Sequence, residues 1–252
     1  MYPIERRNMI VELLKQKKSI SVSELANQLF IGEATIRRDL EKLEKQNILK
    51  RTHGGAVLSE GLSLEIPLSV REKDHKIEKN IIGEFAASLV NDGDTIILDS
   101  SSTTLSMVNY LKNKKGLTVI TNGAKTAVVL GELLHTKVYC TGGVLRENSL
   151  SFIGYQARQF LENFHADKVF FSCRSISMEL GLTDANEDEA ELRRIMIKNS
   201  HKAILLCDHT KFDNNSFCLI NRFEGIESII TDLKPNQQLI DFFNKKNIIL
   251  YY

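Results

Sequence analysis

The sequence predicts an α/β protein with a small, mainly helical N-terminal domain and a larger C-terminal domain built on a mostly parallel sheet. Helical periodicity runs through the first 58 residues up to a Gly-Gly turn, whereas the remainder alternates short apolar strands with helical segments. A chain of 252 residues, 42% of them hydrophobic, can bury the cores of one or two domains. We predict domains at residues 1–58 and 77–252, joined by an irregular linker at 59–76.

The first two helices of the N-terminal domain are predicted from apolar spacing and from a cap. RRNMIVELLKQKK places Ile10, Leu13 and Leu14 on one helical face. SVSE then predicts a capping box, in which Ser21 accepts a hydrogen bond from the Glu24 amide and the Glu24 side chain returns to the Ser21 amide. We therefore expect a second helix over SELANQLF.

The third predicted helix, EATIRRDLEKLEKQN, follows a short turn at Ile31-Gly32. Its apolar residues share one face and are Ile36, Leu40 and Leu43. The side chains directed away from that face include Thr35, Arg37 and Arg38. Two helices joined by a tight turn, the second with an exposed basic start, have the geometry of a helix-turn-helix that reads the major groove of DNA.

The segment ILKRTHGGAVL predicts two short strands around Gly54-Gly55, since paired glycines supply the positive φ angles that a tight hairpin needs. This hairpin would form a wing with Arg51 and His53 near its tip. Residues 1–55 hold 11 Lys and Arg against 7 Asp and Glu, whereas the rest holds 22 against 25. The small basic domain is therefore the part expected to contact a polyanion.

The arginines of the third helix also have a plainer explanation. An exposed Arg37 could pair with Glu33 or Glu41, four residues away on the same helix. The capping box, the turn, the amphipathic helix and the Gly-Gly hairpin together favour DNA contact over a merely solvated face.

These residues resemble the N-terminal winged helix-turn-helix of the DeoR family of bacterial sugar-metabolism regulators. The resemblance rests on TIRRDL followed by RTHGGA. One difference is Gly32, where the family usually has a serine; glycine caps a helix at a cost of only about a few tenths of a kcal/mol. The positions predicted to contact DNA are Ser21, Thr35, Arg37, Arg38, Lys42, Arg51 and His53.

The C-terminal domain is predicted to start with an amphipathic helix beginning at Asp74 or His75. Its apolar face would comprise Ile77, Ile81, Ile82, Phe85 and Leu89. The predicted strands are TIILD, LTVITN, KVYCTGG, KVFFS, AILLCD, SIITD and NIILY. The predicted helices between them include Thr103–Leu111, Ala124–Leu134, Gly154–Glu162 and Glu187–Ser200. This alternation implies right-handed crossovers and a mostly parallel sheet, whose ligands bind beyond the carboxyl ends of the strands.

Polar residues collect at these predicted carboxyl ends. They are Asp99 to Thr104, Asn122, Gly142-Gly143 and Asp208 to Lys211. Ordinary turn chemistry would explain any one of these loops taken singly. Their convergence on one rim of the sheet favours a binding site.

The stretch ILDSSSTTL sets a run of hydroxyl side chains directly before a helix. Unpaired first-turn amides and the helix dipole favour an anion at such a point, and the hydroxyls add donors, so we expect a phosphate there. Asp99 would repel a phosphate and is expected to accept from loop amides or from a sugar hydroxyl. NEDEAELRR, in contrast, predicts only a helix cap made by Asn186 with Glu189.

The sequence lacks the motifs that are typical of several classes of function. The chain has no GxxxxGK[ST] or GxGxxG, so a nucleotide-binding loop is not indicated. Its four cysteines show no CxxC pairing and no His at zinc-ligand spacing, so we expect buried free thiols and no metal or cofactor. No apolar run approaches the roughly 20 residues that span a bilayer, and residues 1–15 are unlike a secretory leader, so we expect a cytoplasmic protein.

The order of the C-terminal elements resembles the effector domain of the DeoR family, which is related in fold to ribose-5-phosphate isomerase and binds phosphorylated sugars. Matching stretches include DGDTIILDSSSTT, TVITNG, TGGVLRENSLSFIG and LLCDHTKF. The candidate effector positions are Asp99, Ser101, Ser102, Thr103, Thr104, Asn122, Arg146, Arg174 and Lys211. Arg174 lies in CRSIS, where this sequence departs from the family; it either contacts a phosphate or carboxylate or pairs with Asp184 or Glu179.

We expect a DNA-binding transcriptional regulator, a repressor of a sugar-catabolic operon that responds to a phosphorylated sugar. One small reading head covers only a few base pairs, so paired half-sites and a homodimer or tetramer are expected. The alternative is a sugar-phosphate isomerase in which Asp99 or Asp208 is the general base and Lys211 its electrostatic partner. The attached DNA-reading domain favours the regulator.

Overall fold

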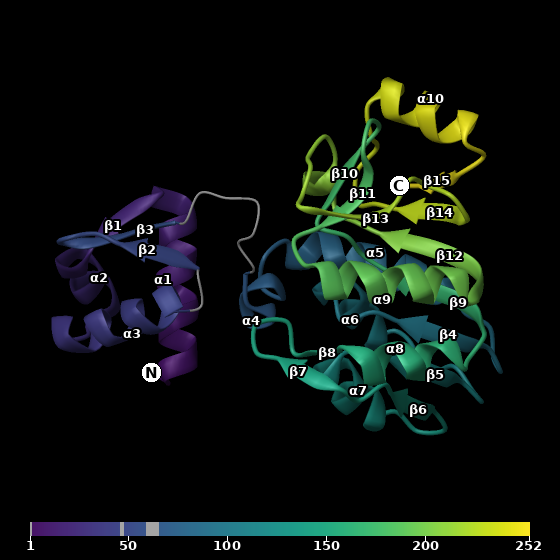
Figure 1. Ribbon diagram of the computed structural model, residues 1–252, viewed down its shortest axis with the longest axis horizontal. Coiled ribbons are helices and arrows are strands. Elements are labelled where there is room, and N and C mark those ends of the chain that lie inside the picture. The colour runs from purple at the N-terminus through teal and green to yellow at the C-terminus, as the bar shows by residue number, and fades with distance from the viewer. Residues whose placement is uncertain (1, 46–47, 59–65) are drawn as a thin grey trace. The chain divides into compact units, whose positions relative to one another are not determined.

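The computed structural model describes residues 2–45, 48–58 and 66–252 (Figure 1). The chain divides into two compact units, Met1–Val70 and Arg71–Tyr252. Residues 59–65 of the predicted linker lie outside the described residues. The remainder of that linker contains a short helix, α4 (Leu68–Arg71), and leads into α5 (Lys76–Ser88), so it is partly helical rather than irregular.

Three helices and a three-stranded antiparallel sheet form the N-terminal unit. They are α1 (Pro3–Lys17), β1 (Ser19–Ser21), α2 (Val22–Leu29), α3 (Glu33–Lys45), β2 (Leu49–Arg51) and β3 (Gly55–Leu58). The strand order β1-β3-β2 adds β1 to the predicted hairpin. The core residues at most 2% exposed include Ile10, Leu14, Ile36, Leu40 and Leu43. The apolar faces predicted for the first and third helices are therefore confirmed.

The turn between α2 and α3 has the geometry of a helix-turn-helix. Ser21 Oγ accepts from the Glu24 amide at 3.1 Å, as predicted, while the Glu24 carboxylate pairs with the Lys17 ammonium. Phe30 ends α2 in the left-handed conformation, with φ 54°. The carbonyl of Gly32 accepts from the amides three and four residues later, at 2.9 and 3.2 Å, so Gly32 begins α3 without a side-chain cap.

A seven-stranded parallel sheet forms the centre of the C-terminal unit. Its strands are β4 (Thr95–Leu98), β5 (Thr118–Thr121), β6 (Lys137–Cys140), β9 (Ala166–Phe171), β12 (Ser200–Leu206), β14 (Ile226–Ile230) and β15 (Ile249–Tyr251). They are arranged in the order β15-β14-β12-β9-β4-β5-β6, and every neighbouring pair is parallel. All seven were predicted, because buried parallel strands are short, continuous apolar runs.

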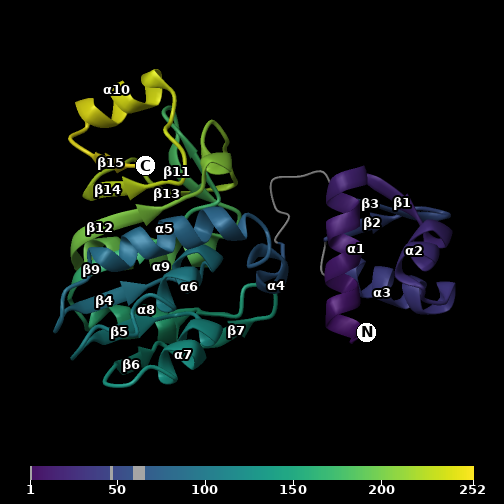
Figure 2. The same cartoon turned by 180° about the vertical axis from the view of Figure 1, so that it is seen from behind.

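Helices cover both faces of this sheet, as the two opposite views show (Figures 1 and 2). One face is covered by α5, α6 (Ser102–Val108) and α7 (Ala124–Gly131), and the other by α8 (Tyr155–Glu162), α9 (Glu187–Lys198) and α10 (Gln237–Lys245). Successive strand residues alternate between the two cores: Ile96 packs with α5 and α6, whereas Ile97 packs with α8 and α9.

The elements that the sequence did not predict are mostly short strands and turns. They are the hairpin β7 (Val144–Arg146) and β8 (Ser151–Ile153), the three-stranded antiparallel sheet of β10 (Ser175–Ser177), β11 (Gly181–Asp184) and β13 (Cys218–Asn221), the 3-10 turn η1 (His209–Lys211), and α10. Strands of three or four residues are too short to show a period in the sequence. These pieces nevertheless carry several candidate site residues.

The buried face predicted for the helix now seen as α5 is correct for Ile82 and Leu89, which pack into the core, but wrong for its three other members. Ile77, Ile81 and Phe85 are 75%, 53% and 39% exposed. The residues that α5 buries are Lys79, Ile82, Gly83, Ala86 and Ala87. Gly83 explains the choice of face, because a Cβ there would lie 2.8 Å from Ser106 Oγ and 2.9 Å from the backbone nitrogen of Met107. Close contact with α6 therefore selects the face with small residues rather than the larger apolar ones.

All four cysteines are free thiols. Cys173 and Cys207 are buried, whereas Cys140 and Cys218 are partly exposed. Burial raises the pKa of Cys173 to about 12, so this thiol is protonated and unreactive at neutral pH. Among the described residues, no helix combines the length and the apolar character needed to cross a membrane.

Candidate functional site

Asp99 organises the loop that follows β4, in the middle of the parallel sheet. Its Oδ1 accepts from the Ser101 amide at 3.0 Å and from Thr104 Oγ1 at 2.8 Å. Its Oδ2 accepts from the Ser172 amide at 3.1 Å and from Arg193 Nε at 2.8 Å. A carboxylate has about four acceptor positions, and all are occupied here. Asp99 therefore holds the loop in place, through loop amides as the sequence predicted.

Some hydroxyls of the run at Ser101 to Thr104 form hydrogen bonds within the loop, and others are left without a partner. Ser101 Oγ accepts from the Thr104 amide at 3.2 Å and so caps α6. Thr104 Oγ1 also lies 2.9 Å from the carbonyl of Asp99, so its single hydrogen is shared between that oxygen and Asp99 Oδ1. Ser101 and Thr104 are therefore both bonded within the loop. Ser102 and Thr103 lie buried in the first turn of α6, and their hydroxyls have no hydrogen-bond partner among the residues that the structure describes. These two hydroxyls are the ones left for a ligand.

Glu189 brings a second buried carboxylate to the same loop. Its amide donates to Asn186 Oδ1 at 3.1 Å, which is the predicted cap of α9. Its side chain turns inward, where Oε1 accepts from Arg146 Nη1 at 3.2 Å and from Ser151 Oγ, and Oε2 accepts from Ser100 Oγ at 3.2 Å. Glu189 thus joins the β4 loop, the β7–β8 hairpin and α9.

Arg193, one turn after Glu189, balances three carboxylates. Its Nη1 bonds Asp184 Oδ2 at 2.9 Å, its Nε bonds Asp99, and its Nη2 lies 3.7 Å from Glu189 Oε2. Burial lowers the pKa of Arg193, but the three carboxylates more than offset this and raise it. For Glu189, burial alone would raise the pKa. The charges of Arg193 and Arg146 and the hydrogen bond from Ser151 outweigh burial, so the pKa of Glu189 is lowered overall. Both groups are therefore ionised at neutral pH.

Sequence reasoning missed Glu189 and Arg193 as site residues. It explained the start of α9 by capping, which is correct for the backbone but says nothing about the Glu189 side chain. The available signal was their spacing of four residues, which places a carboxylate and a guanidinium on one face of a helix that also buries Ala190 and Met196. A charged pair on a buried face needs partners in the interior.

Asn122, at the end of β5, has an unused acceptor. The residue is 1% exposed, and its Nδ2 donates to the carbonyl of Phe152 at 3.3 Å. That contact orients the amide, because the opposite orientation would set two acceptor oxygens against each other. Among the described residues, Asn122 Oδ1 has no donor. A buried acceptor without a partner is costly unless a water or a ligand supplies one.

Cations lie on the side of the site nearest β12. Lys211 is half-buried on η1, next to the buried Asp208. Lys79 of α5 is also buried, and its Nζ donates to the carbonyls of Arg71 and Asp74 at 2.5 and 2.6 Å. Burial lowers the pKa of Lys79 to about 8, although the nearby Asp208 opposes the shift. Burial raises the pKa of Asp208, but Lys211 and Lys79 help to lower it overall.

The two candidate arginines behave differently. Arg146 bonds Glu189 and lies 3.5 Å from Ser149 Oγ. The predicted alternative partner of Arg174, Asp184, is not available to it, because Asp184 Oδ2 is bonded to Arg193. Within the described parts of the chain, the Arg174 guanidinium has no carboxylate within 4.0 Å. The predicted ion pair of Arg174 with Asp184 is therefore wrong, and the one with Glu179 is not formed either.

In the N-terminal unit, α3 presents a row of polar side chains. Arg38 and Lys42 are exposed one turn apart, and Thr35 is half-buried. Arg37 Nη2 lies 3.1 Å from Glu33 Oε2, so the plainer i,i+4 pairing considered for Arg37 is formed. This leaves Arg38 and Lys42 as the better placed cations of the helix.

The wing residues lie at the end of β2. Arg51 Nε bonds Glu44 Oε2 at 2.6 Å, and its amide donates to the other oxygen of that carboxylate at 2.9 Å. His53 is exposed in the turn between β2 and β3. Ser21 serves as the cap of α2. Contact of these residues with DNA stays a prediction.

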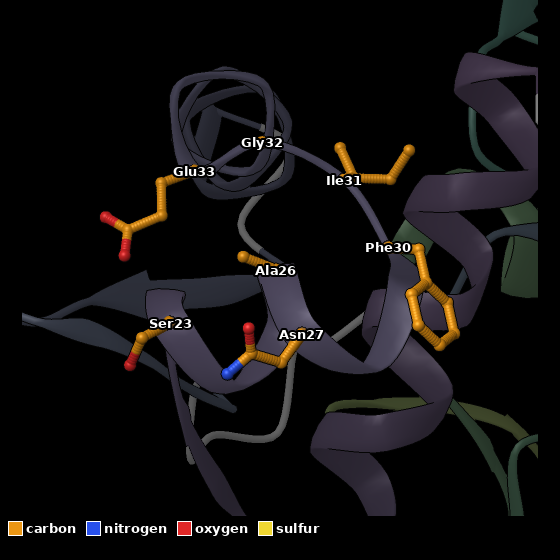
Figure 3. Close-up of a pocket in the computed structure, with 7 residues that line it drawn as sticks. All are labelled: Ser23, Ala26, Asn27, Phe30, Ile31, Gly32 and Glu33. Carbon is orange, nitrogen blue, oxygen red and sulfur yellow. The ribbon is translucent and has the colours of Figure 1, made fainter.

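A shallow hollow lies where α2 turns into α3 (Figure 3). It is lined by Ser23, Ala26, Asn27, Phe30, Ile31, Gly32 and Glu33. Phe30 is 93% exposed, which is unusual for an aromatic side chain. The hollow belongs to the N-terminal unit and contains none of the predicted effector residues.

Comparison with known proteins covers both units. Residues 6–61 match a family described as the DeoR-like helix-turn-helix domain, and residues 74–233 match the DeoR C-terminal sensor domain. The uncharacterized HTH-type transcriptional regulator YulB of Bacillus subtilis is 43% identical, over 92% of this chain and 90% of its own. The HTH-type transcriptional repressor GlcR of the same organism is 36% identical, over 99% of this chain and 96% of its own. A solved ribose 5-phosphate isomerase from Methanocaldococcus jannaschii aligns over 55% of each chain at 15% identity, with a TM-score of 0.41, which is too limited to support an argument.

Proposed function

The chain belongs to the DeoR family of transcriptional regulators, and we propose that it represses a carbohydrate-catabolic operon until a phosphorylated sugar binds its C-terminal unit. Its relatives are DNA-binding regulators and repressors rather than enzymes. The nature of the effector is the open part of this function, and the site's unused hydrogen-bonding groups supply the argument for it.

The unused acceptor of Asn122 is the observation that carries the proposal. An acceptor needs a donor, and a sugar hydroxyl is a donor whereas an ionised phosphate oxygen is not. On the other side of the site, the hydroxyls of Ser102 and Thr103 and the ammonium of Lys211 can all donate. A ligand that satisfies both sides carries hydroxyls at one end and an anion at the other, which describes a sugar phosphate.

The segment that leads into the C-terminal unit is fastened beside this site. Lys79 bonds the carbonyls of Arg71 and Asp74, and Lys125 bonds both oxygens of Glu72 at 2.7 and 2.5 Å. Lys125 lies in the first turn of α7, three residues after Asn122. A ligand that shifts these lysines changes the start of the unit, and it alters DNA binding to the extent that it favours one arrangement over the other.

The proposed DNA contacts are those of the recognition helix and the wing. Thr35, Arg38 and Lys42 would contact base edges and phosphates, and His53 the backbone next to them. We also propose that the protein acts in the cytoplasm and binds paired half-sites as a homo-oligomer. One helix-turn-helix reads too few base pairs for useful specificity.

Purified protein and DNA from the region upstream of its operon would test the proposal. Thermal shift with a panel of sugar phosphates should identify a stabilising compound, and the matching free sugar and inorganic phosphate should each stabilise less. A gel-shift titration with that compound should then release the DNA. Stabilisation by free sugars alone, or release of DNA by none of the compounds that bind, would overturn the proposed effector class.

The isomerase alternative has no supporting observation. All acceptor positions of Asp99 are occupied by donors, including the guanidinium of Arg193, so it is a poor general base. The relatives are regulators over nearly their whole length. We therefore assign the carboxylates of the site to architecture.

A further inference from the structure

The outer face of α5 carries an apolar stripe that no described element covers. Ile77, Ile81 and Phe85 are spaced four residues apart and are 75%, 53% and 39% exposed. The ring of Phe85 lies 4.9 Å from that of Tyr251, between centroids, so the stripe continues onto β15. Figure 2 shows α5 on the near face of the C-terminal unit. Exposed apolar side chains in a row, rather than singly, indicate an interaction surface.

A second row of residues runs beside the stripe, on one flank. Lys76, Asn80 and Glu84 are also spaced four residues apart, each one position before a member of the apolar row. Lys76 and Glu84 are exposed, and among the described residues neither has an ion-pair partner within 4.0 Å. The flank therefore has a positive end, a neutral amide in the middle and a negative end.

We propose that α5 of one chain packs antiparallel against α5 of a second copy. A two-fold axis beside the middle of the helix sets Ile81 against the partner's Ile81, and Ile77 against the partner's Phe85. The same axis places the flanks of the two helices next to each other, on the same side of the interface. It therefore sets Lys76 against the partner's Glu84 and Asn80 against the partner's Asn80.

The charge pattern is the reason for choosing a second copy over another partner. A two-fold interface requires the same surface to complement itself. A flank with lysine at one end and glutamate at the other does so only when the two helices run antiparallel, because the lysine of each chain then faces the glutamate of the other. The central pair, Asn80 with Asn80, joins two amides that can donate and accept. An unrelated partner would have no reason to match this row at both ends.

This inference deepens the proposed function, because it rests on self-association and names the surface that makes it. The position of α5 near the start of the C-terminal unit links this pairing to the DNA-binding units. α5 begins five residues after Arg71, where the C-terminal unit starts, so pairing of α5 fixes the two points from which the DNA-binding units extend. A dimer built elsewhere on the sheet would place that constraint farther from the DNA-binding units along the chain.

The first experiment measures the mass of the full chain by light scattering over a range of protein concentrations. The wild type should be a dimer or a tetramer, and Ile81→Asp should reduce its mass by half or more. Val128→Asp is the matched control, because Val128 is 68% exposed on α7 and its replacement should leave the mass unchanged. The thermal midpoint of each variant checks that it is folded.

The charge row allows a second test that folding defects cannot imitate. Lys76→Glu and Glu84→Lys each bring like charges together twice in the homodimer, so each should weaken it tenfold or more at low salt. The double variant Lys76→Glu with Glu84→Lys should regain the wild-type affinity. A mixture of the two single variants should form a heterodimer, because every pair across that interface is then of opposite charge.

The outcomes separate the two proposals. A wild type that is monomeric at all concentrations overturns both self-association and the surface. An oligomer that survives Ile81→Asp overturns this surface and leaves the proposed oligomer standing. Loss of the oligomer in Ile81→Asp without rescue in the double charge variant overturns the antiparallel arrangement.

Discussion

Arg193 Nε lies 2.8 Å from Asp99 Oδ2, so one hydrogen bond joins helix α9 to the loop that follows strand β4. The two residues are 94 positions apart in sequence and their side chains are 7% and 1% exposed. The same guanidinium also bonds Asp184, which brings the small antiparallel sheet to the site. The geometry of the candidate effector site thus depends on a buried cation that does not itself need to contact the ligand.

Replacing Arg193 should destabilise the protein strongly. Arg193→Met leaves three carboxylates in the interior without their cation, and removing one partner of a buried pair costs about 3–5 kcal/mol. Urea denaturation followed by circular dichroism would measure the loss. Arg194→Met is the control, because Arg194 is exposed and one position away; its replacement should change the free energy of unfolding by about 0.5 kcal/mol or less. Equal stability of the two variants would contradict the role given to Arg193.

The strands of the parallel sheet could be predicted from sequence because each is a short apolar run, and every one except β15 is followed by a polar residue, directly or, for β12, after Cys207. The helix α5 shows where the same reasoning fails. Its large apolar side chains suggested the buried face, but Gly83 permits an approach to α6 that only small side chains allow. Close packing between helices depends on which neighbour is present, and apolar spacing alone does not contain that information.

The candidate site was predictable to the extent that it follows the strand ends. Asp99 and Asn122 stand directly after apolar runs, where parallel sheets bind ligands. Glu189 and Arg193 lie on α9 and reach the site through tertiary contacts. Their spacing marked a charged pair on one helix face, but nothing local marked Asp99, 94 positions before Arg193, as its partner. Lys79 was hidden for the same reason, since a lysine on an amphipathic helix is usually solvated.

A fixed negative charge in the hydroxyl loop should abolish the effector response. Ser102→Glu places a carboxylate where the ligand's anion is proposed to lie, while the DNA-binding unit is unchanged. Fluorescence anisotropy with operator DNA should show wild-type affinity and no release by the identified sugar phosphate. Ser102→Gln has the same shape without the charge and should retain more of the response. A full response in Ser102→Glu would place the anion elsewhere.

Arg38 should matter more to DNA binding than its neighbour Arg37. Arg37 is already paired with Glu33 at 3.1 Å, whereas Arg38 is exposed on the recognition helix. Arg38→Ala should cost about 1–3 kcal/mol of binding free energy if the side chain contacts a guanine. Arg37→Ala should cost less. Both affinities must be measured at one salt concentration, since phosphate contacts make binding salt-dependent. A larger loss for Arg37→Ala would reverse this assignment.

Lys79 should make stability rise with pH in the alkaline range. Burial lowers its pKa from 10.5 to about 8, so between these values the unfolded chain holds a proton that the folded protein has released. The free energy of unfolding therefore increases as pH rises from about 8 to about 10.5, by up to about 3 kcal/mol from this group. Below pH 8 the lysine is protonated in both states, and its contribution is constant.

The Lys79→Met variant isolates that contribution, because methionine fills much of the same space without titrating. The difference in unfolding free energy between wild type and variant should be flat below pH 8 and should then shift in favour of the wild type up to pH 10.5. The variant also loses the bonds to the carbonyls of Arg71 and Asp74, so DNA release by the effector should weaken while effector binding persists. A pH-independent stability difference would contradict the lowered pKa. Unchanged DNA release would contradict the proposed role of Lys79 in coupling the two units.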